Sequence, residues 1–385
     1  MRNVLLGCGM ALALASSAQA GGFTVIHSFM GGSNDGQSPF AGVTPAGSGG
    51  FYVATDGGGT SNKGTLTLIR KDGTSQVLHS FTGGSDGQNA DGAPVKWSFD
   101  GSIYGTTQFG GSKGCGTIYR YAPGSGAYQQ IYAAGCAPDG AFPFAGLAES
   151  TFYNALLGTG YSGGSNDDGT TLFVNSGGAG SSCLNVFSSS NGSHPYAGAI
   201  TTTDGNLYTV TTAGGANNLG TIVEIPVGTC SATILHNFTG GGDGAIPYGT
   251  FLSYNNVLYG TTSKGGGPGL GTVFKINPDG SNYTVLHAFQ GINQHSDGSF
   301  PHAGLMLSKT DGMLYGTTIN GGNSSDLGTV FKIDPNTGKE KVVHAFSGSD
   351  GAHPYGKLYI KTGKIYGTTV AGGASNLGVV FRLKG

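Results

Sequence analysis

The chain has 385 residues, 76 of them glycine, with 10% charged residues and a formal net charge of −2. So few charges exclude a coiled coil, a charge-rich disordered tail and a basic nucleic-acid-binding protein, because each needs many ionised side chains. A collagen-like helix is excluded as well, since glycine does not occupy every third position.

The first residues have the features of a secretory signal peptide. Arg2 supplies a positive start, residues 4–15 are apolar, and Ala18-Gln19-Ala20 is a small-x-small cleavage site. No later segment approaches the ~20 apolar residues that span a bilayer. We therefore predict a signal peptide at 1–20 and a secreted or periplasmic protein without a membrane span.

The rest of the chain consists of four short phrases that recur in a fixed order. Tyr-Gly-Thr-Thr is clearest at residues 259–262, 315–318 and 366–369, and Gly-Thr-Val-Phe follows it at 271–274 and 328–331. His-x-Phe and then Asp-Gly-x-x-Pro complete the unit. The copies are spaced by about 52 residues, so seven units fill the chain after the signal peptide.

Taken in chain order, the units predict short strands and no helix. Residues 24–29 correspond to the fourth strand of a unit. Each following unit has strand a after Asp-Gly-x-x-Pro, strand b at Tyr-Gly-Thr-Thr, strand c at Gly-Thr-Val-Phe and strand d ending in His-x-Phe. The chain ends with residues 379–383, a third strand. We predict an all-β fold, with residues 21–385 forming a single seven-bladed β-propeller of four antiparallel strands per blade. The N-terminal strand would complete the last blade, in a 1+3 closure.

Four cysteines follow the signal peptide, and an even number in an exported chain suggests disulfides. Cys115 precedes strand c of the second unit and Cys136 follows its strand d, so the hairpin brings the two together. Cys183 and Cys230 remain as the second pair by elimination. There is no Cys-x-x-Cys, so a zinc or redox motif is not expected.

The longer connections, from d to a and from b to c, lie on the same face of the predicted ring, and we expect a ligand to bind there. Near the proline that leads into strand a, several copies carry a histidine or tyrosine. These candidate ligand-binding residues are His194, Tyr196, Tyr248, His302, His353 and Tyr355. Such groups can stack on a sugar ring or transfer protons; the alternative is ordinary loop packing.

The repeated acidic and imidazole groups have a simpler interpretation. The Asp-Gly aspartates, assigned as Asp35, Asp91, Asp139, Asp243, Asp297 and Asp350, are expected to cap turns. The five repeated histidines, His27, His79, His236, His287 and His344, are expected to be structural. The loops lack the D-x-D-x-D-G spacing of a calcium site, so no metal and no cofactor is predicted.

Signatures of an enzyme are scarce. The sequence has no G-x-S-x-G, no phosphate-binding loop and no H-E-x-x-H. Glycoside hydrolysis needs two carboxylates at a defined separation, and none of the three glutamates, Glu149, Glu224 and Glu340, clearly lies on the favoured face. No catalytic residue is assigned, and whether the protein is an enzyme stays open.

The succession of phrases over residues 258–289 resembles the GloVer tandem-repeat family of exported bacterial proteins. The resemblance covers essentially the whole chain after the signal peptide and is strongest in units five to seven. Family members often carry a variable C-terminal anchor; here the chain stops at Gly385, so free secretion or a periplasmic location is expected. The resemblance implies the architecture and brings no activity or site residues.

Together these features predict a secreted, monomeric propeller that binds a polysaccharide or a cell-surface protein on its long-loop face without catalysis. The alternative is a carbohydrate-active enzyme, either a polysaccharide lyase or a glycoside hydrolase, with its site at the mouth of the central channel. A purely structural surface protein is the third possibility.

Overall fold

The computed structural model describes residues 22–385 except residues 48, 176–178, 184–185 and 293–296. The predicted signal peptide, residues 1–20, lies outside the described residues. In the part of the chain that is described, no helix is long and apolar enough to cross a membrane.

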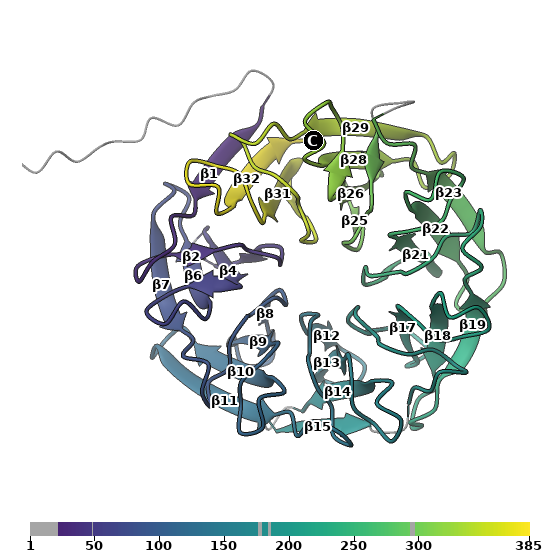
Figure 1. The fold of residues 1–385 in the computed structure, drawn as a ribbon, viewed down its shortest axis with the longest axis horizontal. Coiled ribbons are helices and arrows are strands. Elements are labelled where there is room, and N and C mark those ends of the chain that lie inside the picture. The colour runs from purple at the N-terminus through teal and green to yellow at the C-terminus, as the bar shows by residue number, and fades with distance from the viewer. Residues whose placement is uncertain (1–21, 48, 176–178, 184–185, 293–296) are drawn as a thin grey trace, which may run out of the picture.

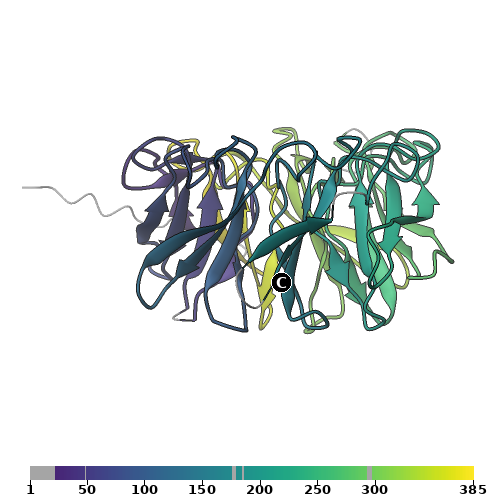
Figure 2. The same cartoon turned by 90° about the horizontal axis from the view of Figure 1, so that it is seen from below.

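Seven four-stranded antiparallel sheets stand in a closed ring around a central channel, which confirms the predicted seven-bladed propeller (Figure 1). Seen edge-on, the strands run between the two faces of the ring, and the more elaborate loops gather on one face (Figure 2). The strands of each blade are named in order from the one nearest the channel to the one on the outer wall.

The first three blades contain the strands β3 (Thr44–Pro45), β4 (Phe51–Thr55), β6 (Thr65–Ile69) and β7 (Ser75–Ser80); β8 (Val95–Lys96), β9 (Ile103–Thr107), β10 (Thr117–Ala122) and β11 (Ala127–Ala133); and β12 (Ala148–Ser150), β13 (Ala155–Gly160), β14 (Thr170–Val174) and β15 (Gly180–Cys183).

The next three blades contain β16 (Ile200–Thr201), β17 (Leu207–Thr211), β18 (Thr221–Ile225) and β19 (Thr233–Asn237); β20 (Leu252–Tyr254), β21 (Val257–Thr262), β22 (Thr272–Ile276) and β23 (Thr284–Ala288); and β25 (Met306–Leu307), β26 (Leu314–Thr318), β28 (Thr329–Ile333) and β29 (Glu340–Ala345). Two small ladders join β2 (Gly36–Gln37) to β5 (Gly57–Gly58) and β24 (Gly298–Ser299) to β27 (Asn320–Gly321).

The seventh blade closes the ring as predicted. It contains β30 (Tyr359–Lys361), β31 (Lys364–Thr369), β32 (Val379–Lys384) and, from the other end of the chain, β1 (Thr24–Ser28). Strand β1 pairs antiparallel with β32, with Thr24 opposite Arg382 and Ser28 opposite Val379. This pairing joins the two ends of the chain in one sheet and leaves no open end to the array of blades.

The hydrophobic core is divided among the interfaces between blades. Each His-x-Phe phrase contributes a fully buried phenylalanine: Phe29, Phe81, Phe238, Phe289 and Phe346. Phe346 on the sixth blade packs edge-on against Phe381 on the seventh, with ring centroids 5.4 Å apart. Burial of such rings stabilises the fold by about 2–3 kcal/mol each, which is needed because few charged groups are present to form ion pairs.

The small residues of the repeated phrases have packing roles. In most blades the last Thr of Tyr-Gly-Thr-Thr bonds to the Thr that opens strand c; the two hydroxyl oxygens of Thr262 and Thr272 lie 2.9 Å apart in a fully buried site. The glycine leaves room for the strand-c phenylalanine: a Cβ on Gly316 would lie 2.5 Å from Cζ of Phe331. The phrase therefore describes one strand packed closely on its neighbour.

Both expected disulfides are present. Cys115 pairs with Cys136 at a Cα separation of 5.4 Å, and Cys183 pairs with Cys230 at 5.7 Å. The first closes the ends of the β10–β11 hairpin, and the second ties β15 to the loop before β19 in the next blade. Two disulfides fit an oxidising location such as the periplasm or the cell exterior.

Candidate functional site

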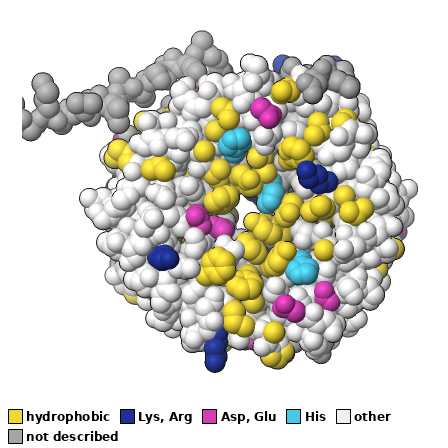
Figure 3. Space-filling view, viewed as in Figure 1, with side chains coloured by type: hydrophobic (Ala, Val, Ile, Leu, Met, Phe, Trp, Pro, Cys, Tyr) yellow, Lys and Arg dark blue, Asp and Glu magenta, His cyan; other side chains and the backbone are white. Residues whose placement is uncertain are grey.

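Seven short segments, each leading into the innermost strand of a blade, converge on the channel at the long-loop face and enclose a cavity of about 230 Å³. In every blade the residue after the entry position, which is a proline in six units and Ala90 in the second, lines this cavity, and all seven are partly exposed. We call these residues the mouth ring: Phe40, Asp91, Phe144, Tyr196, Tyr248, His302 and Tyr355. Figure 3 shows hydrophobic side chains gathered around the small central opening of this face, with histidine and acidic side chains among them.

The segments can converge because glycine lets adjacent backbones touch. A Cβ on Gly304 would lie 2.1 Å from the carbonyl oxygen of Thr250, and one on Gly42 would lie 2.0 Å from that of Lys357. Neither distance is possible for a real side chain. Backbone atoms, and not side chains, must therefore form most of the channel wall where these segments meet. The mouth ring supplies most of the side chains that a ligand would meet.

Aromatic contacts run around most of the mouth ring. Tyr248 stacks on His302 with ring centroids 4.0 Å apart, and Tyr355 meets His302 at 5.1 Å. Phe144 stacks on Tyr196 at 4.7 Å. Burial among these rings lowers the pKa of His302 to about 3, so the imidazole is neutral at physiological pH. Burial, and then the nearby charge of Asp91, raises the pKa of Tyr196.

Asp91 is the one carboxyl group in the mouth ring, and its position corrects the sequence assignment. We assigned Asp91 to the Asp-Gly phrase of the second unit, but Asp86 takes that role, because its carboxylate meets His79 at 3.1 Å. Ala90 stands where other units have the entry proline, and that replacement concealed the register. Asp91 therefore occupies the place of the ring aromatics.

The carboxyl group of Asp91 lies beside that of Asp56, at the end of strand b of the preceding blade. Burial raises the pKa of Asp91 to about 8, and the charge of Asp56 and a hydrogen bond to it add to the effect. The Asn89 amide donates to Asp56 at 2.6 Å. The other oxygen of Asp91, Oδ1, is buried and has no hydrogen-bond partner among the described residues. The raised pKa favours the protonated form of Asp91 at neutral pH, beside the carboxyl group of Asp56 at the rim of the cavity.

Lys357 lines the same cavity, two residues beyond the mouth ring. Five of the other units have glycine or alanine at this position, and the remaining one has Thr250. No hydrogen bond or ion pair links the Lys357 ammonium to any residue in the described ranges, and burial lowers its pKa. Among the described residues, the Lys357 amine in the channel therefore has no hydrogen-bond or ion-pair partner, a feature that sequence reasoning missed.

The structure separates the six candidate residues into two groups. Tyr196, Tyr248, His302 and Tyr355 belong to the mouth ring. His194 and His353 do not line the cavity.

His194 and His353 come just before the entry proline, in left-handed backbone conformations with φ of 57° and 54°. Their backbone N–H groups donate to carbonyl oxygens in the preceding blade, of Asp168 and Leu327 respectively. Nδ1 of His353 also lies 2.9 Å from the carbonyl oxygen of Ile319. These two histidines hold loops together behind the ring.

The repeated His and Asp residues form pairs that hold the d-to-a loop. His344 Nε2 lies 2.9 Å from Asp350, whose other oxygen accepts the backbone N–H of Ser347. Equivalent pairs are His27–Asp35, His79–Asp86, His236–Asp243 and His287–Asp297, and in the third blade Tyr132 bonds to Asp139. Each aspartate thus bonds to a side chain of the outer strand, which is a histidine in five blades and Tyr132 in the third, and to a loop backbone N–H. Within the described ranges, one cluster offers three ligand atoms for a metal ion: His287, Asp297 and Glu340, on the outer wall.

The fold and the mouth ring define a closed β-propeller with a ligand-sized cavity at one end of its channel. By sequence the chain belongs to the Gloeobacter/Verrucomicrobia repeat family, whose model matches residues 7–173 and 153–381, in agreement with the resemblance seen in the repeated phrases. A comparison with curated proteins finds no match.

Solved structures share the fold. A proposed 6-phosphogluconolactonase from Bacteroides uniformis is 15% identical at a TM-score of 0.53, over 82% of this chain and 87% of that one. A puromycin-hydrolysing peptidase from Mycobacterium tuberculosis is 13% identical at a TM-score of 0.55, over 93% of this chain and 54% of that one. At such identities the likeness concerns the fold alone.

Proposed function

We propose that this protein is an exported, non-enzymatic propeller that binds the terminal residue of a glycan at the mouth of its channel. The observation that carries the proposal is the mouth ring, in which six partly exposed aromatic groups and one carboxyl group surround a single cavity.

The composition of the mouth ring suits a sugar. Pyranose rings present C–H faces that pack on aromatic rings, and their hydroxyl groups need a few fixed polar partners, which Asp91 and the tyrosine hydroxyls supply. The cavity of about 230 Å³ is smaller than the roughly 300–1,000 Å³ of typical small-molecule sites. It therefore suits one terminal residue better than a segment of a chain threaded through the ring.

The separation of the two carboxyl groups and the pKa shifts of His302 and Tyr248 support binding over catalysis by these groups. Hydrolysis of a glycoside uses two carboxyl groups about 5–9.5 Å apart, whereas Asp56 and Asp91 are in hydrogen-bond contact. A lyase needs a base that is active near neutrality, but the pKa of His302 is lowered to about 3 and the pKa of Tyr248 is raised by burial. Neither group is tuned for proton transfer.

The test is a screen of immobilised neutral and acidic oligosaccharides, with detection of newly formed chain ends. The variants are Tyr248→Ala in the mouth ring and, as the matched control, Tyr254→Ala, an exposed tyrosine at the end of β20 in the same blade, next to the a-to-b turn on the opposite face. We expect Tyr248→Ala to weaken binding at least ~10-fold, the scale of an aromatic hot spot, and Tyr254→Ala to bind like the wild type.

Three results would overturn the proposal: no glycan binds, Tyr248→Ala binds as tightly as the wild type, or new chain ends appear. The last would favour the carbohydrate-active enzyme.

A further inference from the structure

The outer wall of the ring has a repeated contact between neighbouring blades. The imidazole of a His-Asp pair is covered by a ring at or just before the start of the outer strand of the next blade, four residues before that strand's own histidine position. Tyr128 stacks on His79 at 3.7 Å and Tyr283 stacks on His236 at 4.0 Å.

The contact recurs where the chain ends meet, because Phe23 covers His344 at a centroid distance of 4.0 Å. In these three interfaces a flat aromatic ring stacks on the imidazole of the pair.

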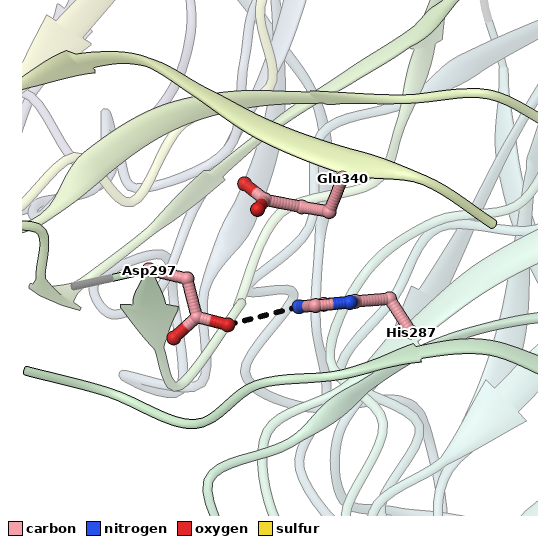
Figure 4. A group of neighbouring side chains, drawn as sticks. All are labelled: His287, Asp297 and Glu340. Atoms are coloured by element: carbon pink, nitrogen blue, oxygen red, sulfur yellow. Dashed lines mark hydrogen bonds and ion pairs between the residues drawn. The ribbon is translucent and has the colours of Figure 1, made fainter. Parts of the chain in front are cut away.

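At the interface between the fifth and sixth blades, this position is occupied by Glu340. Figure 4 shows the Glu340 side chain reaching from β29 toward the His287–Asp297 pair of the neighbouring blade. Glu340 is partly buried, and its Oε1 is buried without a hydrogen-bond partner in the parts of the chain that are described. Burial raises the pKa of Glu340; the charge of His287 opposes this rise, and the charge of Asp297, the smallest of the three influences, adds to it.

The ligand atoms are already close to a coordination geometry. One atom each from His287, Asp297 and Glu340 lie within 4.8 Å of one another, and His287 Nε2 is 2.9 Å from Asp297 Oδ2. Two ligands at right angles, each about 2.1 Å from an ion, stand about 3.0 Å apart. The backbone N–H groups of Gln290 and Gly291 donate to Asp297 Oδ1 at 3.0 and 2.6 Å, which fixes the carboxylate and leaves Oδ2 facing the imidazole.

We propose that His287, Asp297 and Glu340 form a binding site for a divalent transition-metal ion such as Zn²⁺ between the fifth and sixth blades. One imidazole with two carboxylates suits a borderline ion better than Ca²⁺ or Mg²⁺, which prefer oxygen ligands alone. The His287 side chain is 20% exposed, so water can complete the coordination. Ligation uses the Nε2 lone pair, so the imidazole proton resides on Nδ1.

The ion would neutralise two carboxylates held close together and would link the outer strands β23 and β29. It would thus replace the stacked ring that joins other pairs of blades. The sequence predicted no metal, because no single loop has ligand spacing; here the ligands come from two blades, and His287 and Glu340 are one repeat apart.

Titration calorimetry of Zn²⁺ into the chelator-treated full chain tests the proposal, with the variants Glu340→Gln and Glu340→Tyr. Glu340→Tyr restores the ring found at Tyr283, so it is expected to fold as stably as the metal-free wild type. Glu149→Gln, at an exposed glutamate that bonds to Ser98, is the matched control. We expect one Zn²⁺ per wild-type chain, at least ~10-fold weaker binding in both Glu340 variants, and no change in Glu149→Gln.

Thermal unfolding gives a second measurement. Zn²⁺ should raise the unfolding temperature of the wild type and of Glu149→Gln but not of Glu340→Tyr, because a ligand that binds only the folded state stabilises it. The proposal is overturned if the wild type binds no Zn²⁺ in one-to-one ratio, or if Glu340→Tyr binds it as tightly as the wild type.

Discussion

Replacing Asp91 by asparagine should stabilise the protein at alkaline pH and have little effect in acid. An acid whose pKa is higher in the folded than in the unfolded chain loses stability as pH rises between those two values, since the unfolded state ionises first. For Asp91 the window runs from the ordinary aspartate pKa of 3.8 to about 8. Asparagine never ionises, and its amide can donate to Asp56 as the protonated acid does.

The magnitude follows from the width of that window. Between pH 5 and pH 8 the unfolded carboxyl is ionised and the folded one is protonated, a span of about three units at roughly 1.36 kcal/mol each. The upper limit is therefore about 4 kcal/mol. Water at the channel mouth screens the partly exposed group, so we expect a gain of about 1–2 kcal/mol in Asp91→Asn relative to the wild type over this range.

The assay is urea unfolding of the wild type and Asp91→Asn at several values between pH 5 and pH 8, with the disulfides intact. Asp86→Asn, in the same blade, is the control with the opposite sign. It weakens the contacts of Asp86 with His79 and the Thr82 backbone N–H, and should destabilise the protein by about 1–3 kcal/mol. The reasoning is refuted if the difference between Asp91→Asn and the wild type does not change with pH, or if Asp91→Asn is the less stable at pH 8.

Three further substitutions test the core, the channel wall and the channel. Phe346→Ala empties a fully buried site between blades and should cost about 3–5 kcal/mol in urea unfolding; a cost below about 1 kcal/mol would mean that the blades repack freely. Gly304→Ala places a Cβ against the Thr250 carbonyl and should lower the unfolding temperature, whereas Gly267→Ala, which meets nothing within 4 Å, should not. Lys357→Met should weaken binding of carboxylate-bearing glycans ~10-fold and leave neutral ones unchanged; an equal loss for both would contradict a role for its charge.

Part of the candidate site was accessible from the sequence. Tyr196, Tyr248, His302 and Tyr355 were found because they follow a proline that marks the same point in each unit. Asp91 was misplaced, since Ala90 replaces that marker and the sequence offers a second Asp-Gly pair within the same loop. Aligning the seven copies on Asp86 would have placed Asp91 in the mouth ring.

The repeat phrases by themselves determined the number of blades, the strand order, the 1+3 closure and both disulfides. Each of these features depends on the local strand pattern or on the number of repeat units, and both can be read from the amino-acid sequence. Only the tertiary structure decided that Asp91 meets Asp56, that Lys357 lines the channel without an ion-pair partner among the described residues, and that Glu340 faces His287. These contacts join residues of neighbouring blades, and the distances between them are set by how blades pack, which no spacing along the chain reports.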